Sequence, residues 1–520
     1  MKRSKAHSKA PRTPKTLLGT DPRGIRLRTV LQYPRVLSGA LVAGIGLWAL
    51  PLSGCGSPCT GVGCADEYGA TRVGIHFADR LLTAGSNTPR RTDAVLLGDR
   101  SAGVDWSVLA VAQRLWVGMP AQGELRAFDI EDGDRLETTD QAALLRSETT
   151  GDRFGTQLCP MGDIGGDGIL DVAVSAPSSS VTPNDREVGT VYIVPVTALD
   201  AGTLTLNAPQ IRTITGPQSG GRMGESLTRC PDMDGDSEPE LLVGVPWYDD
   251  GENNPLAGAA ILILSSDYPE GGGQGYSAAG SEIWSGPNPG ARAGTSVACA
   301  DLIGDDTPDI IIGAPFADGE HEGAGAVFII DGADRLQGQL DLVASRILSG
   351  TIENDWLGWA VATGDLDSDG RVDLIAGAPG HIQSPGPEVS RPQGLTLIWD
   401  GQDLSDERRD IPRTRIQGEE DGDSIGRAIA ATDIDADGDV DLLIGAPRRL
   451  VNDAYDAGSL YIYKTEPQSA ALRPQVSTED AYSVWEAGRP YYQTGGTFTV
   501  GDIDGDGASD LILVHRRQPG

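Results

Sequence analysis

An acidic loop returns through this chain at nearly constant intervals, and this repetition limits the possible fold more than any other feature. The best-preserved copy spans residues 364–379 and reads GDLDSDGRVDLIAGAP. Four aspartates occupy positions 1, 3, 5 and 9 of the loop, and Gly370 at position 6 can adopt the positive φ that turns such a loop back. The apolar run that follows ends at Gly-Ala-Pro, which is typical of the end of a strand.

Six copies of this loop are present, and their first aspartates lie 69, 69, 64, 68 and 69 residues apart. So steady a period indicates one structural unit that is copied many times. The copies supply the candidate metal ligands, which are, in chain order, Asp163, Asp167 and Asp171; Asp232, Asp234, Asp236 and Glu240; Asp301, Asp305 and Asp309; Asp365, Asp367, Asp369 and Asp373; Asp433, Asp435, Asp437 and Asp441; and Asp502, Asp504, Asp506 and Asp510.

Each unit also holds strand-like runs separated by turn residues, without helical periodicity. Four short strands in about 66 residues predict one blade of a propeller. A first copy without the acidic loop begins near residue 99, and the last copy stops after two strands. We therefore expect residues 69–77 and 93–98 to complete the last blade and close the ring, which hides the sheet edges. The alternative is an open or six-bladed arrangement with an N-terminal cap. The predicted blades are approximately 99–150, 151–220, 221–290, 291–350, 351–420, 421–488, and 489–520 completed by 69–98.

The repeat resembles a known family. Phe154-Gly155, an acidic loop and a following Gly-Ala-Pro look like the FG-GAP repeat of integrin α-subunit propellers. The resemblance extends from about residue 69 to the end. It implies an all-β, seven-bladed propeller with four antiparallel strands in each blade and calcium in some of the loops between strands 1 and 2. It says little about function, because one fold serves many functions.

Carboxylate oxygens at this spacing suit a hard cation the size of calcium. The loop is not an EF-hand, because position 12 holds Ala376, Ile444 or Leu513 and not a bidentate glutamate. We expect Ca²⁺ in the three intact loops that begin at Asp365 and at its two C-terminal copies, and in up to six loops. The alternative is an acidic hairpin without an ion, which mutual repulsion of the carboxylates disfavours.

The N-terminus has a different character. A basic segment precedes the apolar stretch 36–52, and Leu52-Ser-Gly-Cys55 resembles a bacterial lipobox. This order predicts a secretory signal over 1–54, lipidation of Cys55, a tether over 55–68 and the propeller over 69–520. The chain is then an exported lipoprotein of the bacterial outer membrane or cell surface. The alternative is a plain membrane anchor, because 17 apolar residues could just cross a bilayer.

Alternate connections of an antiparallel blade lie at opposite edges. The acidic loops should therefore share one face, and the longer loops the other. Those longer loops carry four candidate ligand-binding residues, Trp247, Tyr248, His381 and Tyr455. Cys159, Cys230 and Cys299 precede three successive acidic loops, where we predict small buried thiols; a disulfide between neighbouring blades is the alternative.

The charge and the histidine content of the chain disfavour two classes of function, nucleic-acid binding and catalysis. A formal charge of −34 disfavours nucleic acid, which needs a basic footprint. Five histidines, scattered without metal-ligand spacing, predict a protein that is not an enzyme. The favoured function is adhesion or capture of a protein or glycan ligand through the loops opposite the calcium face. The alternatives are a structural envelope component and, less favoured, a hydrolase of surface polysaccharide or lipid.

Overall fold

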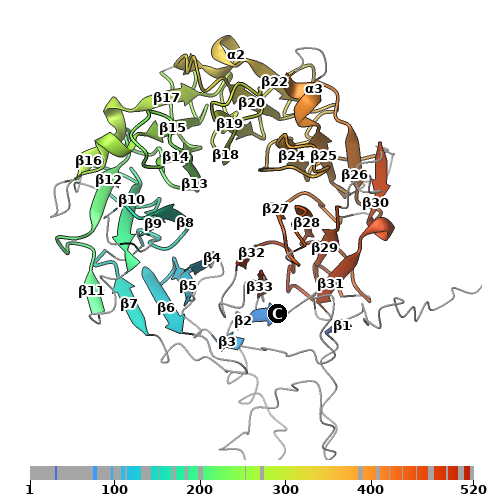
Figure 1. The fold of residues 1–520 in the computed structure, drawn as a ribbon, viewed down its shortest axis with the longest axis horizontal. Helices are drawn as coiled ribbons and strands as arrows, with labels where there is room; N and C mark the ends of the chain where they lie inside the picture. The colour runs from blue at the N-terminus through green and yellow to red at the C-terminus, as the bar shows by residue number, and fades with distance from the viewer. Residues whose placement is uncertain are drawn as a thin grey trace, which may run out of the picture.

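The chain folds as an all-β propeller whose strands stand around one axis in the computed structural model (Figure 1). The structure describes residues 107–111, 114–129 and 142–515, apart from gaps of which the longest are 197–202, 384–390, 466–473 and 502–508. It also describes three strand segments nearer the N-terminus, β1 (Val30–Leu31), β2 (Gly74–Ala78) and β3 (Val95–Leu97).

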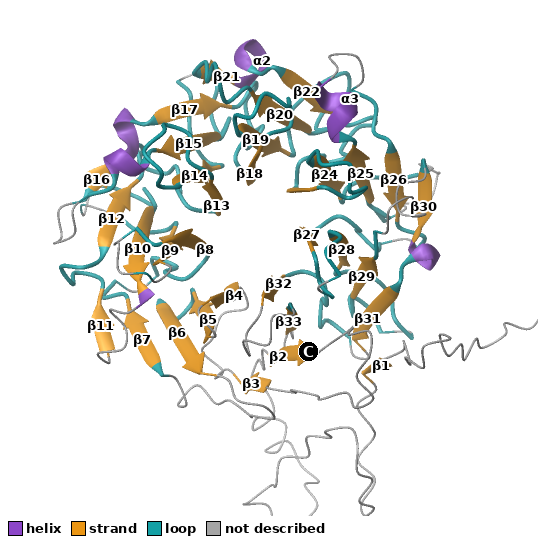
Figure 2. Ribbon diagram, in the orientation of Figure 1, coloured by secondary structure: helices purple, strands orange, loops and turns teal. Residues whose placement is uncertain are grey.

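Six sheets are built from strands that follow one another along the chain, and each runs from an inner strand beside the axis to an outer strand at the rim (Figure 2). Their strands, given from inside to outside, are β4 (Ser107–Val111), β5 (Arg114–Met119), β6 (Glu124–Asp129) and β7 (Ala143–Arg146); β8 (Leu158–Gly162), β9 (Asp171–Ala176), β10 (Thr190–Pro195) and β12 (Arg212–Thr215); β13 (Ser226–Cys230), β14 (Glu240–Val245), β15 (Ala259–Ile263) and β17 (Glu282–Ser285); β18 (Ser296–Ala300), β19 (Asp309–Ala314), β20 (Ala326–Ile330) and β22 (Arg346–Ser349); β23 (Ala360–Gly364), β24 (Asp373–Ala378), β25 (Leu395–Trp399) and β26 (Thr414–Gln417); and β27 (Ile429–Thr432), β28 (Asp441–Ala446), β29 (Ser459–Tyr463) and β31 (Ser483–Ala487).

One more sheet joins the two ends of the chain. β32 (Phe498–Gly501) and β33 (Asp510–His515) pair with β2, and β2 pairs with β3, all antiparallel. The pairing is the one predicted for the two N-terminal strands. Gly501 of β32 lies against Ala110 of β4, and Leu511 and Leu513 of β33 pack into the same cluster as Leu443 of β28.

Five sheets carry a short parallel strand on their outer edge. Four of these strands come from the segment that leads to the outer strand of the following sheet. They are β11 (Thr203–Thr205) on β7, β16 (Tyr276–Ser277) on β12, β21 (Gly338–Gln339) on β17 and β30 (Gln475–Ser477) on β26. The fifth is β1, which lies beside β31 although it falls within the predicted leader. Other predictions for residues 1–68, including Cys55, lie outside the described residues.

The core lies between neighbouring sheets. Each second strand is buried along its whole length in the six consecutive sheets except at Arg114, because both of its faces are covered. In one such layer Leu242 and Trp284 pack against Ile312 and Phe328 of the next sheet. Short helical turns, including α2 (Leu340–Val343) and α3 (Gly401–Ser405), lie at the rim (Figure 2). In the described part of the chain, no helix has the length and apolar character needed to cross a membrane.

The prediction of separate buried thiols is wrong for two of the three cysteines. Cys230 and Cys299 form a disulfide between β13 and β18, and the alternative prediction holds for them. Cys159 is a buried free thiol, as predicted. Its side chain packs with Met161 and Leu241.

Candidate metal centres and the opposite loop face

The acidic loops share a hydrogen-bonded frame, and the copy at Asp365 shows it best. The Asp365 carboxylate accepts hydrogen bonds from the backbone N–H groups of Asp369 (3.1 Å) and Gly370 (2.8 Å). Gly370 adopts the expected positive φ of 88°. In the five loops whose first aspartate the structure describes, that aspartate therefore folds the loop around its own carboxylate, before any ion is considered.

In three loops the ninth residue ties the loop to the body of the sheet. Asp373 is 2% exposed and accepts hydrogen bonds from Leu366 N–H and from Gly401 N–H at the start of α3, just after β25, both 2.9 Å. Asp441 and Asp309 make the equivalent pairs of contacts.

Burial raises the pKa of these anchoring acids, and backbone hydrogen bonds oppose the rise. The pKa of Asp373 and Asp441 reaches about 7, and that of Asp309 about 6. Burial likewise raises the pKa of Glu240 to about 7, with the neighbouring aspartates adding to the effect. A nearby cation would favour the ionised form of each acid.

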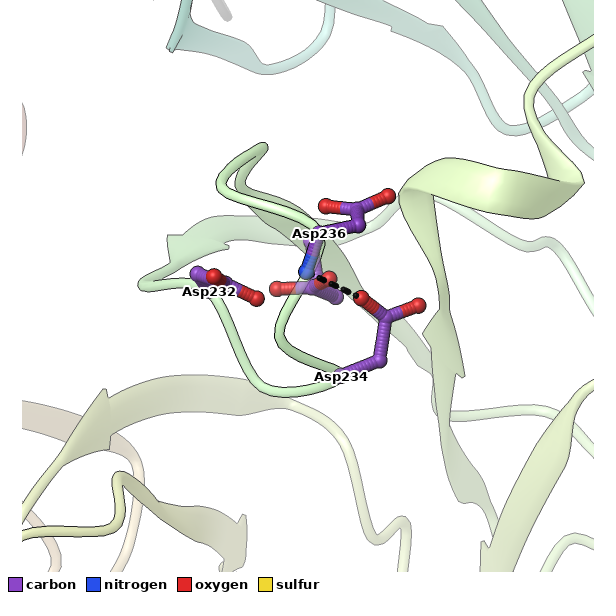
Figure 3. Close-up of side chains that lie close together, drawn as sticks. Asp232, Asp234 and Asp236 are labelled. Carbon is purple, nitrogen blue, oxygen red and sulfur yellow. Dashed lines mark hydrogen bonds between the residues drawn. The ribbon is translucent and has the colours of Figure 1, made fainter.

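The loop at Asp232 gathers the fullest set of ligands. Asp232, Asp234, Asp236 and Glu240 each offer an oxygen, and these oxygens lie within 4.8 Å of one another. Figure 3 shows the three aspartates around the turn of the loop. Ser237 adopts the left-handed conformation (φ 75°) at the position where glycine stands in the intact copies. The sequence placed this loop behind the three intact copies, whereas the structure gives it the most complete cluster among the described residues.

Two of the intact loops gather three acids each. One group is Asp365, Asp367 and Asp373, and the other is Asp433, Asp435 and Asp441. The acids at position 5, Asp369 and Asp437, are not part of these groups; each accepts a hydrogen bond from a backbone N–H two residues later.

A basic side chain reaches each of these two groups. The Arg413 guanidinium donates to Asp367 (2.6 Å) and to Asp400, and the Lys464 ammonium donates to Asp435 and, at 3.3 Å, to Asp437. These side chains offset part of the negative charge of the loops. A cation at either site would share its carboxylates with them.

The remaining loops are less complete. Asp163 and Asp171 each accept a backbone hydrogen bond, and so do Asp301 and Asp305, but within the described residues neither loop brings three acids together. Asp167, Asp502, Asp504 and Asp506 lie outside the described residues, while Asp510 begins β33.

Three buried carboxylate oxygens indicate that these loops suit a cation. Glu240 Oε1, Asp367 Oδ1 and Asp435 Oδ1 are buried without a hydrogen-bond partner among the described residues. A buried polar atom normally has a partner, and these three belong to the three acidic groups. The all-oxygen, multiply anionic donor sets fit a hard divalent cation such as Ca²⁺.

The longer loops lie on the face opposite the acidic loops. Loops between strands 2 and 3 contact the connections between sheets: Gln218 exchanges hydrogen bonds with the backbone of Asp249, and Asn288 pairs with Asp318. The acidic loops instead contact the ends of the third strands, as Gly401 shows. The two predicted faces are therefore present.

The four predicted ligand-binding residues differ in their surroundings. Trp247 and Tyr248 are half-buried, and Tyr455 is 60% exposed. His381 is buried, and its Nδ1 lies 2.8 Å from Asp355 Oδ1, so it serves the packing of its loop. Of the four, Tyr455 has the most exposed side chain.

Sequence reasoning missed most of a continuous row of planar side chains on this face. We call it the arginine–aromatic strip; it crosses four consecutive sheets and consists of Arg222, Trp247, Arg292, Phe316, Trp356, Trp359 and Arg427. All seven members flank the Phe-Gly-like motif or follow the Gly-x-Pro motif, so the signal lay in positions beside the motifs.

Comparisons with known proteins agree with the repeat. The FG-GAP repeat model matches residues 154–194, 293–330, 357–388 and 425–463. Phosphatidylinositol-glycan-specific phospholipase D of Bos taurus is 30% identical over 172 residues, which are 32% of this chain and 19% of that protein.

Integrin α subunits are also similar to the chain. Integrin alpha-5 of Xenopus laevis is 28% identical over 244 residues, 44% of this chain and 21% of that protein, and integrin alpha-V of Gallus gallus is 28% identical over 179 residues, 34% of this chain and 15% of that protein. The chain spans about a fifth of the length of the first of these curated relatives.

Proposed function

We propose that this chain, which carries FG-GAP repeats and is similar to integrin α subunits, is a calcium-stabilised binding or adhesion propeller at the cell surface. The observation that carries the proposal is that the two faces of the propeller present different kinds of side chain. One face holds the acidic loops, and the other presents longer loops with half-buried aromatic and basic side chains. Recognition residues commonly sit on loops that a rigid scaffold holds.

In this proposal Ca²⁺ has a structural role. The groups at Asp232, Asp365 and Asp433 hold it, and the degenerate loops at Asp163 and Asp301 and the loop at Asp502 are further candidates. The ion supplies the counter-charge that lets several carboxylates converge on one loop. Its binding to the folded state alone raises the stability of the propeller.

We also propose how the ring closes. The sheet of β2, β3, β32 and β33 acts as the seventh blade and closes the ring, with support from the packing of β33 on its neighbour. The leader over 1–54, lipidation at Cys55 and the tether over 55–68 would place residues 69–520 outside the cell, anchored to the membrane by lipid. Metabolic labelling with a palmitate analogue, with and without Cys55→Ser, tests the anchor.

A ligand screen tests the binding function. The intact chain in calcium is applied to a glycan array and to a pull-down from surface extracts, alongside Trp247→Ala and Tyr455→Ala. A reproducible ligand that either substitution weakens supports the proposal. A screen without any ligand would favour a structural envelope component.

The similarity to phospholipase D supports a second candidate, a hydrolase of surface lipid or polysaccharide. The prediction that the chain is not an enzyme therefore remains a prediction. A turnover screen with phosphatidylinositol glycans and surface polysaccharides distinguishes the two, since sustained product release would contradict a pure binding role.

A further inference from the structure

The arginine–aromatic strip is joined by contacts of 4 to 6 Å between successive planar groups. The guanidinium carbons of Arg222 and Arg292 lie 4.8 and 4.4 Å from the centre of the Trp247 rings. Arg292 also lies 5.9 Å from the centre of the Phe316 ring. Two guanidinium groups therefore stack on one indole, which is a common arrangement for arginine.

The strip continues as an aromatic cluster. Phe316 meets Trp356 and Trp359 edge-on with ring centres 6.0 and 6.1 Å apart, and the two indoles are tilted by 42° with centres 5.9 Å apart. Arg427 then stacks 4.0 Å from the centre of the Trp359 rings. All seven side chains are half-buried, so each keeps part of its surface in water.

Arg292 has an unusual charge environment. Arg222 pairs with Glu187 at 2.6 Å and Arg153 pairs with Glu225 at 2.8 Å, but no carboxylate of the described residues lies within ion-pair distance of Arg292. Burial and then the nearby Arg222 charge lower the pKa of Arg292, and the charge of Glu225, which pairs with Arg153, opposes them. A partly desolvated guanidinium with five donors and no carboxylate within ion-pair distance is suited to an anion that arrives from outside.

The repeat itself does not require these side chains. Arg222, Arg292 and Trp356 occupy a position that has positive φ in other repeats as well. Ser424 and Gln493 fill that position elsewhere with the same backbone. The backbone geometry therefore belongs to the fold, whereas the gathering of arginines and indoles in consecutive sheets needs a separate explanation.

We propose that the arginine–aromatic strip binds an acidic glycan, with Arg292 receiving a carboxylate or sulfate group and the aromatic rings packing against sugar rings. This inference rests on the proposed binding function and names its ligand class. Sugar rings offer flat C–H faces, which match planar aromatic surfaces. Protein-binding surfaces also use tryptophan and arginine, but as anchors at the centre of fully desolvated pockets, whereas the strip is a continuous row of half-buried planar groups. Its length across four sheets suits an extended chain.

The test uses the intact chain in calcium and four probes: oligogalacturonate, a heparin-derived oligosaccharide, a neutral galactan oligosaccharide and poly-L-glutamate. Binding is measured by calorimetry and by tryptophan fluorescence. We expect oligogalacturonate, the heparin oligosaccharide or both to bind, and the neutral galactan to bind at least tenfold more weakly. The first two probes distinguish a carboxylate from a sulfate as the recognised group.

Substitutions place the binding on the strip. Arg292→Gln and Trp359→Ala should each weaken acidic-glycan binding about tenfold or more, the scale of a lost charged hydrogen bond. Arg292→Lys should fall between, because it keeps the charge and loses the planar fork. Arg415→Gln, at an exposed position of the outer strand β26 and outside the strip, is the control and should leave binding unchanged. Thermal unfolding shows whether each variant is folded.

Other outcomes overturn the inference. Poly-L-glutamate binding with the same dependence on Arg292 would assign the strip to acidic peptides. A ligand from the screen that Tyr455→Ala abolishes and Arg292→Gln leaves intact would uphold the proposed function and refute the glycan site. If neither the four probes nor the screen yields binding, both proposals fail.

Discussion

Gly313 of β19 lies directly against Gly358 of the next sheet, and an added Cβ on Gly313 would overlap the Gly358 carbonyl oxygen. The same carbonyl accepts a 2.8 Å hydrogen bond from the hydroxyl of Ser296 on β18. The glycine of Gly-Ala-Pro in one sheet and that of the Phe-Gly motif in the next are therefore two halves of a single contact. The equivalent pairs are Gly118 with Gly155, Gly244 with Gly294, Gly377 with Gly426, and Gly445 with Gly495.

Gly313→Ala should destabilise the fold by about 1–3 kcal/mol, the usual cost of forcing extra atoms into a packed contact. Urea unfolding of the intact chain measures the loss. Gly280→Ala is the matched control, because an added Cβ there meets nothing within 4 Å. Equal stability of Gly313→Ala and Gly280→Ala would show that the glycine pair does not set the spacing between sheets.

Chelation should lower the melting temperature by several degrees or more, because Ca²⁺ binds only the folded state. Asp234→Ala should remove a smaller part of this shift, since the groups at Asp365 and Asp433 would keep their ions. Differential scanning calorimetry with calcium and with chelator provides the measurement. An identical melting curve under both conditions would falsify the calcium proposal.

The calcium shift should also depend on pH. Without metal, the folded-state pKa of Asp373 and Asp441 is about 7. The unfolded value is about 3.9, so between these values the folded protein holds more protons than the unfolded one, and stability in chelator falls as the pH rises. Calcium requires the ionised carboxylates, so its stabilising effect should grow as the pH rises from about 5 to about 8. A melting shift of equal size at both ends would contradict this assignment.

Lys464→Met should have opposite effects with and without calcium. Lys464 contacts Asp435 and Asp437, so in chelator its loss leaves those carboxylates without a counter-charge and should lower the melting temperature. In a calcium titration the same variant should reach its full melting temperature at a lower calcium concentration, since a competing cation is gone. Arg415→Met is the control, and a variant with an unchanged titration would show that Lys464 and calcium do not share the loop.

The Cys230–Cys299 disulfide closes a loop of one repeat, since the two positions are separated by 69 in the sequence. Its removal should cost about 2–4 kcal/mol, chiefly by freeing the unfolded chain. Urea unfolding of Cys230→Ala/Cys299→Ala against the parent measures the loss, and Cys159→Ala serves as a thiol control. Non-reducing peptide mapping that finds both cysteines as free thiols would contradict the pairing.

Much of the fold could be predicted from the spacing of the repeats, because each repeat forms its loop and strands through contacts between residues close in sequence. The loop frame of Asp365 uses contacts within nine residues, and the strand pairing of β2 with β33 follows from an incomplete last unit. The basic side chains that contact the acidic loops could not be predicted from the sequence. Arg413 reaches Asp367 from 46 residues away and Lys464 reaches Asp435 from 29, and such reach depends on how neighbouring strands lie side by side.

The binding face was harder to predict for a related reason. Trp247 drew attention as an exposed-loop aromatic, but its neighbours Arg222 and Arg292 come from two different connections between sheets. His381 was predicted to bind a ligand from its place in a long loop, but in the structure it is buried against Asp355. Sequence reasoning also did not single out the disulfide between Cys230 and Cys299. These two cysteines lie two residues before the first aspartate of their acidic loops, whereas Cys159 lies four residues before Asp163, so the spacing did distinguish the pair.

The parallel strands β11, β16, β21 and β30 decide where the propeller can be truncated. Each one adds to the outer edge of the preceding sheet, so four sheets are completed by residues that lie beyond their own last strand. A chain that ended directly after β7, β12, β17 or β26 would leave that strand with an open edge, a known route to aggregation. A stable truncation should therefore extend past the parallel strand that follows.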